Sequence, residues 1–352
     1  MDWNWFKRHW KLLLNIATLL ALAVLAFAIR DQLVQTFANL AHVRAEALLL
    51  LIPIEVLNYH AQAKLYQRLF AALDEKVSYR AMLRTSLELN FVNHVFPSGG
   101  ISGISYFGFM LGRLGVRVTK ATLIQTMKLI LLFLSFQILL FIGMFILAAS
   151  GRADDFTILI GGMLSVLVIA GTGIFIYVIR SQTRITAFLT PLVELTNRLI
   201  ALVRPKSPET INVRRVQKLF EEFHYDYLQL RARYRELAWP FFWALIANIT
   251  EVLAIYVVYI AFDAFVNVGA VILAYAVANF AGLVSVLPGG IGIYEALMTS
   301  VLVISGIPAR LSLPVTVMYR VLNTLLQVPP GYVLYHLSLR RNPTVKIGEN
   351  NA

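Results

Sequence analysis

Six charged side chains interrupt long apolar segments of the sequence: Glu55, Glu88, Lys128, Glu251, Glu295 and Arg320. An ionised group is costly inside an apolar helix, so such residues pair with one another or line a polar cavity. Arg320 begins a stripe that continues with Asn323 and Gln327, which lie on the same helix face. The pattern predicts a polar cavity in which Arg320 and Lys128 bind an anion, and phosphate is the natural candidate.

The acidic residues of this set allow two interpretations. They can compensate the two cations and hold the helices together, or they can take part in the site. Glu55 and Glu251 have no motif beside them, which favours a structural role. Glu295 is expected to complement the positive end of a helix, and contact with a cationic head group or proton coupling are its alternatives.

Two apolar regions, 79–118 and 268–307, are broken in the middle by proline and glycine. The breaks are Pro97, Ser98, Gly99 and Gly100 in the first region, and Pro288, Gly289 and Gly290 in the second. Such a break ends one helix and lets another begin, so each region is predicted to be a re-entrant helical hairpin. The helix that restarts after each glycine pair has free N–H groups at its start, and these favour an anion.

The amino-acid composition indicates that the helices carrying these residues span a membrane. Of the 352 residues, 59% are hydrophobic and 14% are charged, whereas soluble domains are about half apolar and a quarter charged. The apolar residues come in blocks of about 20, the length that crosses a bilayer as a helix. We predict an all-α polytopic membrane protein with six transmembrane helices, at 12–29, 46–63, 121–149, 156–179, 239–262 and 313–337.

The order of these elements repeats once along the chain. The first half, 1–150, has two spans, a hairpin and a span, and the second half, 151–352, has the same order. Three crossings in each half turn the second half upside down, which predicts an inverted repeat of the kind found in many transporters.

The basic residues support this topology. Under it, 25 of the 31 Lys and Arg residues lie on one side and 4 on the other. Because basic loops stay in the cytoplasm, the N-terminus, the loop 180–238 and the C-terminus are predicted to be cytoplasmic in a multi-pass protein of the cell membrane. The formal charge of +12 is explained in this way, without nucleic acid as a partner.

Several kinds of chemistry are not expected. The chain has no cysteine, which excludes disulfides and thiolate metal sites, and its six histidines are scattered. We expect no metal, no cofactor and no catalytic residues. The single long polar segment, 180–238, predicts an amphipathic helix from Ser207 onward that lies on the inner leaflet. A dock for anionic lipid or for a cytoplasmic enzyme is the alternative.

Around the breaks the chain resembles the flippase-like family that forms the membrane region of lysylphosphatidylglycerol synthases and also occurs as stand-alone proteins. The resemblance rests on Asn279, the string from Leu287 to Gly292, Glu295 three residues beyond, the break 97–100, and Arg320. It covers nearly the whole chain. The sequence ends soon after the last predicted span, so the soluble aminoacyl-transferring domain of the synthases is not expected.

The resemblance implies translocation of lipids between leaflets, for example of aminoacylated phosphatidylglycerol, hopanoids or lipid-linked sugars. Together with the predicted anion site, it favours a flippase or transporter of an anionic, phosphate-bearing lipid, with membrane lipids as partners. A scaffold that recruits a cytoplasmic lipid-modifying enzyme through 180–238 is the main alternative. A membrane-embedded transferase is disfavoured, because the sequence lacks a clustered acidic or His–acid motif near one interface.

Overall fold

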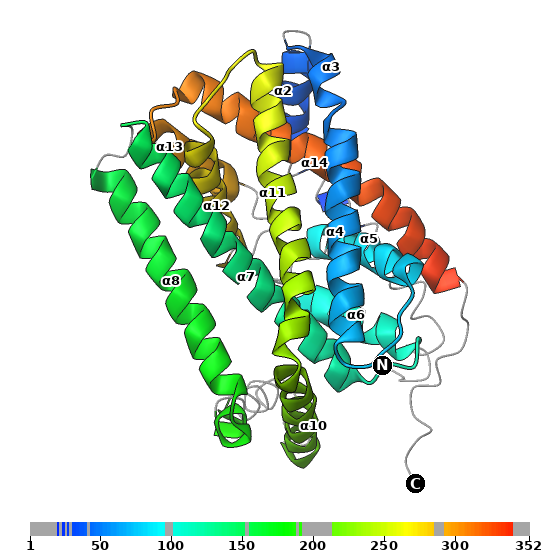
Figure 1. Ribbon diagram of the computed structural model, residues 1–352. Coiled ribbons are helices and arrows are strands. Elements are labelled where there is room, and N and C mark those ends of the chain that lie inside the picture. The colour runs from blue at the N-terminus through cyan, green and yellow to red at the C-terminus, as the bar shows by residue number, and fades with distance from the viewer. Residues whose placement is uncertain are drawn as a thin grey trace, which may run out of the picture.

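The computed structural model describes residues 20, 23–24, 27, 30–40, 43–95, 101–151, 155–187, 190–191, 213–284 and 292–340. In these ranges all regular structure is helical, as predicted (Figure 1). The main helices are α2 (Arg30–Leu40), α3 (Ala45–Leu48), α4 (Leu51–Ala71), α5 (Tyr79–Val95), α6 (Ile101–Gly112), α7 (Val118–Ala149), α8 (Asp155–Ile179), α10 (Val213–Ala232), α11 (Ala238–Ala261), α12 (Val268–Val284), α13 (Ile293–Ile304) and α14 (Ala309–Arg340), with a 3-10 turn, η1 (Tyr234–Leu237), before α11.

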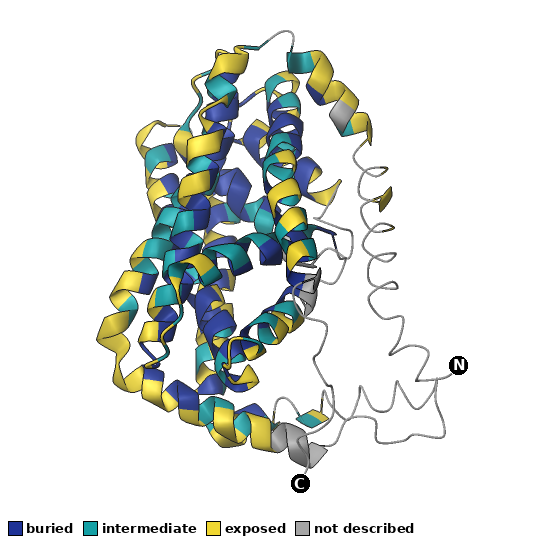
Figure 2. Cartoon of the chain, turned by 90° about the vertical axis from the view of Figure 1, so that its right-hand side faces the viewer, coloured by how far each residue is buried: buried dark blue, intermediate teal, exposed yellow. Residues whose placement is uncertain are grey.

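Three helical segments of the described chain are long and apolar enough to cross a membrane. They are α7, α8 and the segment Tyr234–Ala261 that contains α11. Large apolar side chains on α8, such as Leu159, Met163 and Val166, are more than half exposed. Exposed residues lie on the outward faces of the bundle and buried ones on the inward faces (Figure 2). Exposed apolar side chains on helices long enough to cross a bilayer indicate a membrane protein.

Helices α4 and α11 pack together at the centre of the bundle and run in opposite directions (Figure 1). The backbone N–H of Arg44, before α4, donates to the Ala261 carbonyl at the end of α11, at 2.9 Å. At the other end the guanidinium of Arg68 lies 5.9 Å from the ring centre of Trp239. Buried alanines on both helices, including Ala61 and Ala247, allow the two backbones to approach closely.

The two regions that were predicted to be hairpins are each a pair of helices. Helices α5 and α12 have 17 residues each, α6 and α13 have 12 each, and the long helices that follow, α7 and α14, have 32 each. Helix α5 packs on α14, and α12 packs on α7. Each pair therefore contacts the long helix of the other half of the chain.

Matching turns connect the short helices to the long ones. Gly115 and Gly306 have φ values of +81° and +85°, a region in which glycine carries no steric penalty. The residue after each glycine closes the preceding helix by an N–H bond to a carbonyl five residues earlier, at 3.0 Å for Val116 and 2.9 Å for Ile307. This is the Schellman arrangement, repeated at the same place in both halves.

Two further residues with positive φ, Asp74 and Asp263, follow the central helices α4 and α11. Each forms an ion pair with an arginine that precedes the other central helix: Arg233 pairs with Asp74, at 2.6 Å, and Arg44 pairs with Asp263. The two pairs lie at opposite ends of the α4–α11 contact.

Helix α10 lies below the lower end of α11 in Figure 1 and packs against α7. The Arg117 guanidinium contacts the Asp226 carboxylate of α10 at 2.8 Å. Burial raises the pKa of Asp226, and the positive charge of Arg117 opposes this shift. Phe223, Tyr227 and Leu230 of α10 pack against the apolar core. The amphipathic helix expected in 180–238 is therefore held to the bundle.

Some boundaries differ from the sequence prediction. At the predicted span 46–63 the helix α4 begins at Leu51 and continues to Ala71; its last turns contain the half-buried Lys64 and Gln67 and the exposed Arg68. The predicted span 12–29 and the expected start of the amphipathic helix at Ser207 lie almost wholly outside the described residues. The six spans and the division into 1–150 and 151–352 stay predictions.

Candidate functional site

A polar cavity of about 170 Å³ lies between α5, α11, α12, α13 and α14. The side chains that line it are Asn90, His94, Glu251, Tyr275, Asn279, Tyr294, Tyr319, Arg320, Asn323, Thr324 and Gln327. Every one of them has a polar group. Because α11, α13 and α14 carry exposed apolar side chains, such as Leu253, Val303 and Leu313, this cavity is a polar site within a membrane protein.

Helix α14 supplies one wall of the cavity. Tyr319, Asn323 and Gln327 lie on one face of this helix because they follow one another at steps of four residues, and Arg320 lies beside this face, three residues before Asn323. The Gln327 amide nitrogen donates to the Asn323 oxygen at 2.9 Å and to the Glu55 carboxylate at 3.3 Å. These bonds fix the amides that face the cavity.

The two predicted hairpins supply equivalent asparagines. Asn90 is the twelfth residue of α5, and Asn279 is the twelfth residue of α12. The Asn90 nitrogen donates to Gln327 and to the hydroxyl of Tyr59, both at 3.0 Å, and Asn279 donates to the Tyr275 carbonyl at 3.0 Å. The cavity therefore lies where corresponding positions of the two halves meet.

Arg320 is the cation of the cavity. Its Nε lies 3.3 Å from Oε1 of Glu295, and its guanidinium lies 4.3 Å from the ring centre of Tyr294. The other oxygen of Glu295 accepts the backbone N–H of Gly292 at 2.6 Å and so caps α13. Glu295 has both roles that the sequence allowed for a structural acid: it caps a helix and pairs with Arg320.

Glu251 also lines the cavity. Asn58 donates to its Oε1 at 3.2 Å, and the Tyr319 hydroxyl donates to its Oε2 at 2.9 Å. Glu55 is buried nearby, bonded to Gln327. The sequence favoured a structural role for both acids, and the structure brings one of them to the cavity wall.

Comparison with known proteins gives the family. The sequence pattern of the lysylphosphatidylglycerol synthase TM region matches residues 14–331. The chain belongs to this family. It is also 30% identical over 97 residues to a UPF0104 membrane protein of Methanothermobacter thermautotrophicus, a match that covers 28% of this chain and 29% of that protein. The aligned part thus spans less than a third of that relative.

The position of Lys128 differs from the one predicted from the sequence. Its Nζ contacts Gln62 Oε1 at 3.3 Å and the Tyr66 hydroxyl at 3.1 Å, and it does not line the cavity. Of the other predicted site residues, Asn279, Arg320 and Asn323 line the cavity, and Glu295 contacts it through Arg320. Pro97, Ser98, Gly99, Gly100, Pro288, Gly289 and Gly290 lie outside the described residues.

The sequence interpretation missed Asn90, His94, Thr324 and the three tyrosines. Asn90 had a detectable signal, because it stands in the first half where Asn279 stands in the second. The tyrosines gave none, since aromatic residues are common throughout the apolar segments. No group of three potential metal-ligating side chains occurs within the part of the chain that the structure describes, and no residue set there suits a metal cofactor.

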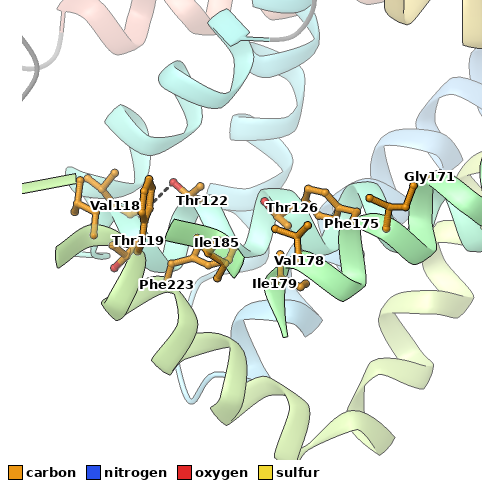
Figure 3. A pocket seen from close by; sticks show the side chains of 13 residues that line it. Val118, Thr119, Thr122, Thr126, Gly171, Phe175, Val178, Ile179, Ile185 and Phe223 are labelled. Carbon is orange, nitrogen blue, oxygen red and sulfur yellow. Dashed lines mark hydrogen bonds between the residues drawn. The ribbon is translucent and has the colours of Figure 1, made fainter. Parts of the chain in front are cut away.

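A second pocket has apolar walls, in contrast to the polar cavity. An apolar pocket of about 430 Å³ lies between α7, α8 and α10, with Val118, Phe175 and Phe223 among its lining residues (Figure 3). The Thr122 hydroxyl donates to the Val118 carbonyl of its own helix at 2.9 Å, which leaves the wall apolar. This pocket suits hydrocarbon, whereas the cavity at Arg320 suits a polar head group.

Proposed function

We propose that the protein moves an anionic, phosphate-bearing lipid between the leaflets of the membrane, with the head group in the cavity at Arg320. The observation that carries the proposal is a polar cavity inside a lipid-facing bundle, lined by a guanidinium and by asparagines from both halves of the chain. Membership of the lysylphosphatidylglycerol synthase TM region family supports a role with lipids. Acyl chains would stay outside the cavity, against the apolar faces.

Phosphate is the head-group chemistry that suits Arg320. A guanidinium is always charged and offers several N–H donors in one plane, which match two phosphate oxygens at once. In the free protein Nε faces Glu295, at 3.3 Å. A phosphate in the cavity competes with this carboxylate for the guanidinium, so the ion pair supplies a way to exchange one anion for the other.

The topology proposed for this function has six spans and two re-entrant hairpins in an inverted repeat. It is supported by the equal helix lengths in the two halves and by the reciprocal ion pairs Arg44–Asp263 and Arg233–Asp74. A 12-residue helix is roughly 18 Å long and a 17-residue helix roughly 25 Å, both short of a hydrocarbon layer of about 30 Å. These lengths favour helices that enter and leave by one side.

We further propose that both termini and the segment 180–238 are cytoplasmic, in a multi-pass protein of the cell membrane. Arg117, Lys120 and Arg233 lie at the α10 end of the bundle, where they pair with acids. Retention of basic residues on the cytoplasmic side supports this orientation. We assign no enzymatic step to the chain.

Reconstitution tests the function. The purified protein would be placed in liposomes that carry fluorescent phosphatidylglycerol in both leaflets, and a membrane-impermeant reductant would bleach the outer leaflet. A transporter makes the inner pool accessible, so the bleached fraction exceeds the outer share. Protein-free liposomes and liposomes with an unrelated membrane protein are the controls.

Two other results would count against transport. Bleaching that stops at the outer share, in liposomes whose protein is folded, would contradict it and favour a scaffold that recruits an enzyme through α10. Conversion of the lipid into a new product would instead favour a membrane-embedded transferase. Fluorescent phosphatidylcholine in a parallel series shows whether the net negative charge of the lipid matters.

A further inference from the structure

Four side chains form a hydrogen-bonded line from Lys128 on α7 to Glu251 at the cavity; Lys128 and Asn58 are buried, and Gln62 and Glu251 are half-buried. Lys128 Nζ donates to Gln62 Oε1 at 3.3 Å, and Gln62 Nε2 donates to Asn58 Oδ1 at 2.7 Å. Asn58 Nδ2 then donates to Glu251 Oε1 at 3.2 Å, and it shares its hydrogens with the Thr250 hydroxyl at 2.8 Å and the Ala247 carbonyl at 3.1 Å. Gln62 and Asn58 are one turn apart on α4, which packs against α11 and also contacts α7.

The line has a direction. Each amide accepts from the lysine side through its oxygen and donates toward the carboxylate through its nitrogen. The two amide dipoles are therefore aligned, with a cationic group at one end and an acid at the other. Aligned dipoles strengthen one another in a medium of low polarity, so the arrangement stabilises both charges together.

The other contacts of Lys128 are with neutral groups. Its Nζ also contacts the Tyr66 hydroxyl at 3.1 Å and lies 4.6 Å from the centre of that ring. The Tyr66 hydroxyl donates onward to Gln125 at 2.6 Å. Among the described residues Lys128 forms no salt bridge, although only 7% of its surface is exposed. A buried ammonium requires compensation, and among the described residues its direct hydrogen bonds are those to Gln62 and Tyr66.

The charged groups around Glu251 also affect whether its carboxyl group is ionised. Glu55 on α4 interacts with it unfavourably when both are ionised. Among the titratable groups that share the cavity with Glu251 are His94 on α5, Tyr275 on α12, Tyr294 on α13, and Tyr319 and Arg320 on α14. Arg320 is paired with Glu295. A positive charge at Lys128 therefore favours an ionised Glu251.

We propose that the charge of Lys128 acts on Glu251 through Gln62 and Asn58, so that this lysine helps to set the pH at which the carboxyl group in the cavity loses its proton. Lys128 and Gln62 are positioning residues: they touch no ligand in the cavity and set the charge of a group that does. The inference rests on the proposed function only for its meaning in transport, since the charge of Glu251 is measurable without any lipid movement.

The protonation of Glu251 can be read by chemical labelling. A hydrophobic carbodiimide reacts with protonated carboxyl groups in a membrane, and mass spectrometry of the peptide that contains Glu251 gives the labelled fraction. The full chain in lipid nanodiscs would be labelled across a pH series. Lys128→Met is expected to shift the labelling curve of Glu251 to higher pH by about one unit or more, because a favourable charge is lost.

Three variants separate the line from other effects. Gln62→Leu keeps the lysine but breaks the line, and it is expected to shift the curve in the same direction. Lys128→Arg keeps a cation and is expected to leave the curve in place. Lys64→Met removes a lysine from the same helix as Gln62 that is bonded to Gln67 instead, at 3.3 Å, and is expected to have no effect.

Unchanged labelling of Glu251 in Lys128→Met and in Gln62→Leu would overturn the proposal. An equal shift in Lys64→Met would also overturn it, because any nearby positive charge would then suffice. Where Lys128→Met does not fold, judged by gel filtration and melting, Gln62→Leu decides alone. A protein that moves no lipid but shows these shifts would contradict the proposed function and leave this inference standing.

Discussion

Removal of the charge on either member of the Arg320–Glu295 pair is expected to destabilise the protein. The side chains of Arg320 and Glu295 are 19% and 7% exposed, and the two polar atoms lie 3.3 Å apart. The pair thus lies between an exposed ion pair, worth at most 1 kcal/mol or so, and a buried one, whose disruption costs roughly 3–5 kcal/mol. For each single change, Arg320→Gln or Glu295→Gln, we expect a loss of about 1–3 kcal/mol.

The double variant carries the decisive information. With both charges removed, no charge is left without its partner, so the double change is expected to recover at least half of the summed losses. Glutamine at position 295 keeps an oxygen that can accept the Gly292 N–H, so the cap of α13 survives. Reversible unfolding in mixed micelles gives the free energies, and Arg310→Gln, an exposed arginine of the same helix, is the control. Losses that simply add would refute the ion pair as a stabilising contact.

Three further predictions follow from the packing and from the proposed topology. Gly331→Ala places a Cβ 2.6 Å from the Leu87 carbonyl oxygen, so a loss of about 1–3 kcal/mol in unfolding free energy is expected, whereas Gly112→Ala meets no atom within 4 Å and should be neutral. Single cysteines at positions 80 and 117, in a chain with no native cysteine, should both react with an impermeant maleimide from the cytoplasmic side only, and labelling from opposite sides would make 79–118 a true span. Asp226→Asn should loosen α10, seen as faster hydrogen exchange in 213–232, because the 2.8 Å contact with Arg117 loses its charge; unchanged exchange would mean that the apolar contacts of α10 suffice.

The sequence predicted the parts of the fold that depend on local pattern. Proline followed by a glycine pair favours the end of one helix and the start of another, so the two broken regions were predictable as pairs of short helices, whereas single prolines such as Pro314 lie inside α14. The stripe of Arg320, Asn323 and Gln327 was predictable because helical spacing alone puts these residues on one face. Their common position at a cavity follows from the cost of placing them in lipid.

Contacts between helices were not predictable in this way. Lys128 was expected at the anion site because it is a cation in an apolar segment, yet the face that carries it packs on α4, where Gln62 and Tyr66 receive it. Glu251 was expected to be structural, and the rotation of α11 turns it to the cavity. A single helix sequence shows which residues share a face but does not show which neighbour that face meets.

Lipid exchange by folded Arg320 variants tests the central claim most directly. In liposomes with fluorescent phosphatidylglycerol, Arg320→Gln is expected to abolish exchange, and Glu295→Gln in addition should not restore it, because the head group has lost its guanidinium. Arg320→Lys is expected to retain part of the exchange, since it keeps the charge but loses the two-pronged geometry. Each variant must first show the gel-filtration profile of a folded protein. Full exchange by a folded Arg320→Gln protein would contradict the claim that the lipid phosphate passes through this cavity.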